Sequence, residues 1–353
     1  MSPKASSGKV QTVLGEVEPE SLGITLTHEH LLIDLRCYFK MPEEASRRWY
    51  VDKQITIEIL GKLQGMFYVN KENQMLLDER FAVQEALRYR YAGGDTVVDT
   101  TSIGIARDPL ALARISRATG LNVVLGGSHY VPEAHPADMD QRSEESIAQR
   151  IIEDVTIGVD GTGVKSGVIG EVGNHTPLTE NMRKVLRASA HAQVETGAPI
   201  LIHPGIHPDT PLEIIRILMD NGARADKVIM GHLDNIRPMS AVKDLADTGC
   251  YLEYDRFGSE DTSGSYRSGD IETSSVSDVQ RMDSLEYLIS EGYGERITIA
   301  HDVCLKTDTV AYGGKGYAHI LESIAPRMRA RGFTEDHIDN ILIHNPARAL
   351  TFA

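Results

Sequence analysis

The sequence predicts one (β/α)8 barrel, also called a TIM barrel. Eight short apolar strands alternate with helices over residues 24–343, which is typical of a parallel sheet. Residue types that bind metal ions end several of these strands, and functional side chains of such barrels lie at the carboxyl ends of strands. A doubly wound open sheet competes with this architecture, but no GxGxxG turn follows a strand. No linker divides the 353 residues, so we expect a single domain over residues 1–353.

The elements follow from apolar runs that glycine and proline interrupt. The segment 109–119, for example, begins with proline and is followed by Gly120, which predicts a helix with a glycine stop. Strands are expected at residues 24–28, 96–99, 121–126, 167–171, 199–203, 227–232, 249–255 and 296–302. Helices are expected at residues 76–91, 109–119, 143–158, 179–196, 211–221, 239–248, 278–290, 317–331 and 334–343.

Three segments lie outside this alternation. Residues 1–22 form a lead-in, as a hairpin or as irregular chain. Residues 35–75 are a long excursion of mixed aromatic and charged character, either functional or a structural cover on the barrel's flank. Residues 256–277 are rich in Gly, Ser and Asp and follow the seventh strand, so we expect a lid loop there and not a disordered linker.

Composition excludes several classes of function. The net charge of −15 argues against a surface for nucleic acid or anionic membrane, which needs clustered Lys and Arg. The three cysteines are widely spaced and form no CxxC pair, which suits free thiols in a reducing compartment. The first residues lack the apolar core of a secretory signal, and no apolar run is long enough to cross a membrane. We therefore expect a cytoplasmic protein.

Metal-binding side chains recur at the ends of five predicted strands. His28 and His30 lie two residues apart on a strand, so both imidazoles point to the same face. A single histidine or carboxylate at a strand end has ordinary structural explanations. Together, however, the residues indicate a metal site, and the candidate ligands are His28, His30, Glu171, His203, His232 and Asp302.

Six ligands exceed the need of one tetrahedral zinc ion and suit two metal ions that share a carboxylate and a water molecule. Such a pair lowers the pKa of the shared water, and the resulting metal-bridging hydroxide attacks a polarised ester, amide or phosphoryl group. The chemistry implied is hydrolysis. Asp302 would contact both a metal ion and the water, so we expect it to be the catalytic group that takes the proton.

At these residues the chain resembles the phosphotriesterase family of the amidohydrolase superfamily, over nearly its whole length. The markers are Leu26-Thr-His-Glu-His30, Gly170-Glu171, His203, Gly231-His-Leu-Asp234, Asp255-Arg256, His301-Asp302 and His344-Asn-Pro346. The resemblance implies that His28, His30 and Asp302 hold the more buried metal ion. It implies that His203 and His232 hold the more exposed one.

One position departs from the family pattern. Phosphotriesterases and related lactonases bridge the metal ions with a carboxylated lysine, whereas this chain has Glu171 at that place. A glutamate supplies two carboxylate oxygens without CO₂, so the bridge is chemically sound. With this glutamate the chain resembles the phosphotriesterase-homology or phosphotriesterase-related subgroup. The glutamate also argues against expecting organophosphate hydrolysis from this chain.

Other residues are expected near the site. Tyr130 is predicted to wall the pocket, and Arg256 to bind a carboxylate, phosphate or sulfonate group of the substrate. Asp234 and Asp255 are candidates to orient metal-bound histidines. Among the remaining histidines, we expect His129 or His175 near the mouth, His301 to be structural, and His191, His207, His319 and His337 to be solvated.

The leading hypothesis is a binuclear metal-dependent hydrolase of a small ester, lactone or amide, with a carboxylic ester or amide favoured over a phosphotriester. The alternatives are a phosphoester hydrolase, a single-metal lyase or isomerase, and a metal-holding barrel without catalysis. The lyase would need a Lys or His base at another strand end, and no predicted strand ends in lysine. We expect two divalent ions, zinc first, with Mn, Co or Fe compatible. The expected partners are a small-molecule substrate and a second copy in a homodimer.

Overall fold

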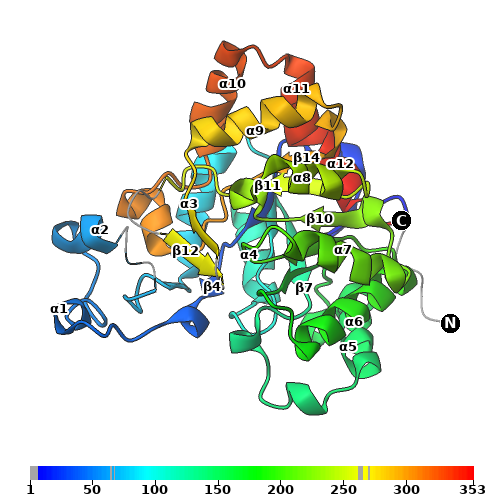
Figure 1. Ribbon diagram of the computed structural model, residues 1–353, viewed down its shortest axis with the longest axis horizontal. Helices are drawn as coiled ribbons and strands as arrows, with labels where there is room; N and C mark the ends of the chain where they lie inside the picture. The colour runs from blue at the N-terminus through cyan, green and yellow to red at the C-terminus, as the bar shows by residue number, and fades with distance from the viewer. Residues whose placement is uncertain (1–6, 64–65, 67, 261–264, 269–270) are drawn as a thin grey trace.

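The computed structural model describes residues 7–353 apart from residues 64–65, 67, 261–264 and 269–270. The chain begins with an antiparallel hairpin of β1 (Val10–Thr12) and β2 (Gly15–Val17), followed by the short helix η1 (Pro19–Leu22). The hairpin and η1 precede the first barrel strand and lie near the C-terminus (Figure 1).

Eight parallel strands form the barrel, and they neighbour one another in chain order. The last strand lies against the first, where the backbone N–H of Asp302 donates to the carbonyl of His28 at 3.2 Å. This topology confirms the predicted fold class. The strands are β3 (Thr25–Glu29), β6 (Thr96–Asp99), β7 (Asn122–Gly127), β8 (Val168–Gly173), β9 (Ile200–His203), β10 (Val228–Met230), β11 (Tyr251–Tyr254) and β14 (Ile297–Ile299).

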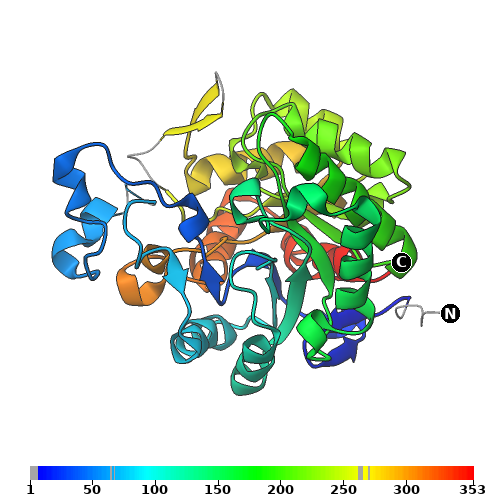
Figure 2. The same cartoon turned by 90° about the horizontal axis from the view of Figure 1, so that it is seen from below.

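Helices surround the strands, as both views of the ribbon show (Figure 1, Figure 2). The helix over residues 109–119 begins where the Asp108 carboxylate accepts the N–H of Ala111 at 2.9 Å, and it ends at Gly120 in the left-handed conformation. The helices are α3 (Glu79–Tyr91), α4 (Pro109–Thr119), α5 (Glu144–Thr156), α6 (Glu180–Thr196), α7 (Thr210–Asp220), α8 (Met239–Ala246), α9 (Asp278–Ser290), α10 (Ala325–Arg331), α11 (Glu335–Asp339) and α12 (Asn345–Leu350).

The barrel interior has an apolar lower part. Val98, Val124, Val168, Leu201 and Ile229 are fully buried and pack together with apolar residues of the lead-in. A second and larger apolar cluster lies between the strands and the helices. Because apolar side chains fill the lower interior, the polar strand-end residues gather at the opposite end, above this core.

The excursion between β3 and α3 contains α1 (Ala45–Arg48) and α2 (Ile57–Leu63), which lie on the side of the barrel away from both termini (Figure 1, Figure 2). Within the expected lid, β12 (Ser265–Ser268) and β13 (Ile271–Ser274) pair as an antiparallel hairpin, and residues 261–264 and 269–270 lie outside the described residues. The lid therefore stays a prediction. Among the described residues, no helix is both long and apolar enough to cross a membrane.

Candidate metal centre

All six predicted ligands meet at the carboxyl ends of the strands. His28 and Glu171 lie within β3 and β8, and His203 ends β9. His232 and Asp302 come two and three residues after their strands, with φ of 55° and 51°, a left-handed conformation that is uncommon outside glycine. The strands predicted over 227–232 and 296–302 end earlier than expected, at Met230 and Ile299.

Gly170 allows Glu171 to lie next to the neighbouring strand. Its φ is 142°, and a Cβ at this position would lie 2.2 Å from the carbonyl oxygen of Leu201. Only a residue without a side chain therefore fits at position 170.

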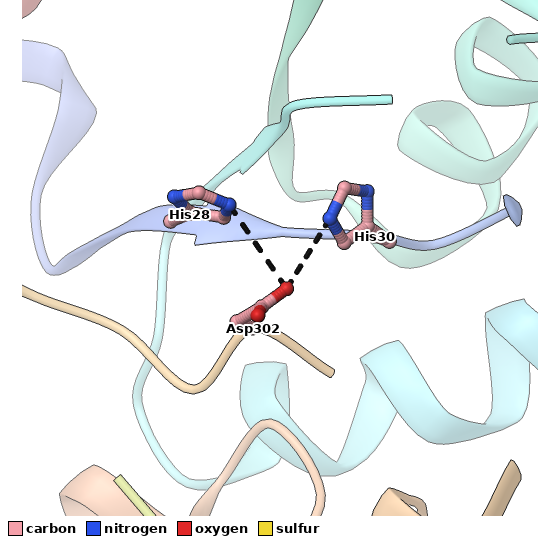
Figure 3. A group of neighbouring side chains, drawn as sticks. All are labelled: His28, His30 and Asp302. Atoms are coloured by element: carbon pink, nitrogen blue, oxygen red, sulfur yellow. Dashed lines mark ion pairs between the residues drawn. The ribbon is translucent and has the colours of Figure 1, made fainter. Parts of the chain in front are cut away.

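One group of ligands is His28, His30 and Asp302 (Figure 3). Asp302 Oδ1 lies 3.3 Å from Nε2 of His30 and 3.9 Å from Nε2 of His28. These two imidazoles also face Glu171, whose Oε1 lies 3.4 Å from His30 Nε2 and whose Oε2 lies 3.4 Å from His28 Nε2. The four side chains are buried, which fits the more buried of two cation positions.

The second group is Glu171, His203 and His232. Glu171 Oε2 lies 3.2 Å from Nδ1 of His203 and 3.5 Å from Nε2 of His232, and these two nitrogens are 2.7 Å apart. The side chains of His203 and His232 are 17% and 14% exposed, against 0% for His28, so this group faces the solvent side. Glu171 stands between the two groups and offers oxygen atoms to both.

Acceptors behind the histidines fix the orientation of the rings. Asp255 accepts from His232 Nδ1 at 2.8 Å, and Glu253 contacts His28 Nδ1 at 3.0 Å. Thr101 Oγ1 lies 2.9 Å from His30 Nδ1 and itself donates to the carbonyl of Leu32, so it accepts from the ring. In each case the proton of the neutral ring is held on Nδ1, so Nε2 can turn a lone pair to a metal ion once its own proton is lost.

The chemistry of this donor set fits two divalent cations. His28 Nε2 is fully buried and has no hydrogen-bond partner within the part of the chain that the structure describes. A buried polar atom without a partner is costly, and a cation among His28, His30 and Asp302 would satisfy it. Nitrogen and carboxylate ligands in these numbers suit zinc and neighbouring transition metals.

Neighbouring charges shift the pKa values of the histidines and carboxylates in this site. Burial lowers the pKa of His30, but hydrogen bonds to Asp302 and Glu171 raise it to about 9. Burial also lowers the pKa of His232, which the Asp255 carboxylate raises to about 10. Burial raises the pKa of Asp302, whereas the Arg256 charge and His30 bring it down to about 2. Protons on the imidazoles thus balance the carboxylates, and cations could replace them.

A pocket of about 670 Å³ opens above the candidate centre. Tyr130 lines it, with its ring centroid 5.2 Å from that of His203 and its hydroxyl 3.3 Å from that of Tyr38. The Arg256 guanidinium also lines it and pairs with Asp302. Tyr38 and other residues of the 35–75 excursion contribute to the wall, so part of this excursion borders the site.

Some residues lie elsewhere than the sequence indicates. His319 was expected to be solvated, but it is 6% exposed and bonds Asp278 at 2.8 Å because α9 packs against its helical segment. Asp234 bonds Arg281 and the backbone after β11, and among the described contacts it touches no histidine. His175 lines the pocket, whereas His129 is buried and is not part of its lining.

Glu253 and Arg281 have roles around the site that the sequence did not suggest. Glu253 is 225 residues from His28 along the chain, and Arg281 lies on a helix among ordinary polar residues. Strand alternation could have indicated Glu253, because it lies two residues before Asp255 and shares its face. No local pattern marks Arg281.

Comparison with known proteins agrees with this geometry. The model of the phosphotriesterase family matches residues 8–350. N-acetyltaurine hydrolase of Salmo salar is 42% identical over 350 residues, with 99% of both chains covered. The phosphotriesterase-related protein of Nematostella vectensis is also 42% identical, over 98% of this chain and 99% of its own length. A crystal structure of a resiniferatoxin-binding protein from Rhodobacter sphaeroides superposes with a TM-score of 0.91 at 33% identity, covering 99% of this chain and 97% of that one. This chain belongs to the phosphotriesterase family and is a hydrolase.

Proposed function

We propose that this chain is a two-metal amidase that cleaves a small N-acyl compound whose amine part carries an anionic group, as in N-acetyltaurine. The observation that carries the proposal is the position of Glu171 between two sets of imidazole nitrogens. The near full-length similarity to N-acetyltaurine hydrolase supports the choice of bond and substrate.

In this proposal His28, His30 and Asp302 hold one zinc ion, His203 and His232 hold the other, and Glu171 bridges both. Two zinc ions supply Lewis-acid chemistry when bound, since they lower the pKa of a water molecule and polarise the acyl oxygen. Mn, Co and Fe accept the same ligand set.

Asp302 is the proposed catalytic residue. With a pKa of about 2 it is ionised at neutral pH, so Oδ2, the oxygen that pairs with Arg256 and does not face His28 and His30, can accept a proton from the attacking water. The water oxygen forms a bond to the acyl carbon, the C–N bond breaks, and Asp302 returns the proton to the departing nitrogen. The products are a carboxylate and an amine, and no other reactant is needed.

Arg256 and Tyr130 are the proposed substrate contacts. Arg256 lies at the pocket beside Asp302 and presents a planar guanidinium, which suits a sulfonate or carboxylate through two hydrogen bonds. Tyr130 would form the pocket wall next to the acyl group of the substrate, beside His203. In this proposal the anionic end of the substrate lies on one side of the site and the scissile bond lies above Glu171.

Arg256→Met is expected to lower kcat/KM for N-acetyltaurine relative to the uncharged N-ethylacetamide by more than about 10-fold, since a charge-assisted pair contributes roughly 1.5–3 kcal/mol. The ratio is informative because Arg256 also contacts Asp302 and its loss affects both substrates. Arg256→Lys keeps the charge but lacks the planar guanidinium, so its kcat/KM ratio should lie between those of the wild type and Arg256→Met. Steady-state kinetics on both amides measure this. An unchanged ratio in Arg256→Met would remove the assigned contact.

Zinc binding to the metal-free protein near pH 7 is expected to release roughly two protons or more, because His30 and His232 with pKa values of about 9 and about 10 are then protonated and neighbouring carboxylates also raise the pKa of His28. A histidine must be a neutral imidazole to bind zinc, so affinity falls as the pH falls, and the release shrinks as the pH rises past about 10. An indicator dye in weak buffer measures the release during titration. Zinc uptake without proton release near pH 7 would contradict the assigned ligands.

The zinc-loaded protein tests the proposed function directly. It is incubated with N-acetyltaurine, an aryl lactone and a phosphotriester, with and without a chelator. We expect chelator-sensitive release of acetate from N-acetyltaurine at a kcat/KM above that of the other two. Faster lactone or phosphotriester turnover, or no amide hydrolysis, would overturn the proposal.

The oligomeric state and the cellular compartment are also part of this proposal. We propose a homodimer, supported by the exposed Met41, Trp49 and Ile57 in the excursion. All three cysteines are free thiols, which supports a reducing compartment such as the cytoplasm.

A further inference from the structure

Arg281 is a fully buried cation that lies outside the proposed ligand set. It belongs to α9 and its side chain is 1% exposed. Its Nε donates to Asp234 Oδ1 at 2.6 Å, its Nη1 to Asp278 Oδ1 at 3.0 Å, and its Nη2 to the carbonyl of Ser259 at 2.9 Å. Each of its three nitrogens therefore has an acceptor, which a buried guanidinium needs in order to be tolerated.

The partners of Arg281 hold the backbone of the turn after β11. Asp234 accepts the N–H of Asp255 at 3.1 Å and that of Arg256 at 3.3 Å. Asp278 accepts the N–H of Gly258 at 2.9 Å. Counting the carbonyl of Ser259, four backbone groups of residues 255–259 are thus bonded to Arg281 or to its two aspartates.

This turn carries two side chains that face the proposed metal centre. Asp255 orients His232 through Nδ1 at 2.8 Å and also lies 3.2 Å from Nδ1 of His28. Arg256 pairs with Asp302 and lines the pocket. A shift of the turn would therefore move a histidine of the centre and the proposed anion contact together.

A buried ion network is weak evidence of stabilisation, since apolar residues of similar volume often stabilise as much or more. From these contacts we infer that Arg281 is a positioning residue: it fixes the turn at residues 255–259, and so sets the selectivity of Arg256 for anionic substrates and the orientation of His232. The selectivity part rests on the proposed function, whereas the part concerning His232 does not.

Arg281→Met and Arg281→Lys test this inference, with Arg107→Lys as the matched control for the lysine variant. Arg107 is also buried, with a side chain 4% exposed and a 2.8 Å pair to Asp154, and it lies outside the pocket lining. The first readout is the ratio of kcat/KM for N-acetyltaurine to that for N-ethylacetamide. The second is the rate at which the zinc-loaded protein releases zinc to a chromogenic chelator. Melting temperature and circular dichroism identify folded variants.

In Arg281→Met we expect the ratio to fall by about 10-fold and zinc release to be about 10-fold faster, since groups that orient ligands typically change affinity by 10- to 100-fold. Arg281→Lys keeps the charge but cannot reach three acceptors, so smaller shifts of about 3-fold are expected, and this variant carries the test if Arg281→Met does not fold. Arg107→Lys should lower the melting temperature with both readouts unchanged.

An unchanged ratio and unchanged zinc release in folded Arg281 variants would overturn the inference and leave the proposed function standing. Equal shifts in Arg107→Lys would also overturn it, because general loosening would then be the cause. If the wild-type protein does not hydrolyse N-acetyltaurine, the proposed function fails. Faster zinc release in the Arg281 variants alone would still support the role of Arg281 in holding His232.

Discussion

Replacing Asp302 with Asn is expected to lower the turnover of N-acetyltaurine by more than about 100-fold, with zinc content near that of the wild type. The amide oxygen of Asn can still ligate a metal ion, but it cannot accept the proton of the attacking water. General acid–base groups typically contribute 10²- to 10⁴-fold. Initial rates at saturating substrate measure the change, and elemental analysis measures the zinc.

Asp154→Asn is the matched control for this substitution. Asp154 is a buried carboxylate that pairs with Arg107 and lies outside the pocket, so its loss should reduce stability while turnover stays within about 3-fold of wild type. Near-normal turnover of zinc-loaded Asp302→Asn would remove the proton-transfer role from Asp302.

Replacing Glu171 with Gln is expected to reduce bound zinc from two equivalents to about one and turnover by about 1,000-fold or more. The neutral amide offers one good oxygen ligand, so it cannot serve both groups of imidazoles at once. Metal content and turnover are measured on the same preparation.

Glu253→Gln is a comparison variant, for which we expect a smaller effect than for Glu171→Gln. Glu253 contacts His28 at Nδ1, the nitrogen away from the site, and accepts from Thr298, so its loss should cost about 10- to 100-fold in activity or zinc affinity and keep both ions at saturating zinc. Two tightly bound zinc ions in Glu171→Gln would contradict the bridging role of Glu171.

The fold could be predicted because its local signals agree with its topology. The helices over 109–119 and 278–290 were predicted to the residue, since a side-chain cap marks the start of each: Asp108 precedes one and Ser277 the other. The strands over 227–232 and 296–302 were predicted too long. Each of these ranges was extended to a candidate ligand, but His232 and Asp302 lie beyond the strands, in a left-handed conformation.

The candidate ligands could be predicted because a parallel barrel brings all strand ends to one side. The contacts that surround them could not, since they join residues far apart in the chain. The separation is 225 residues for Glu253 and His28 and 47 for Arg281 and Asp234. His319 shows the same limit: its own helix gives no sign that Asp278 of α9 will cover it.

Anomalous diffraction at the zinc edge from crystals of the zinc-loaded protein tests the central claim most directly. Two peaks are expected on either side of the Glu171 carboxylate, one beside His28 and His30 and the other beside His203 and His232. A single peak, or Glu171 directed away from both cations, would contradict it.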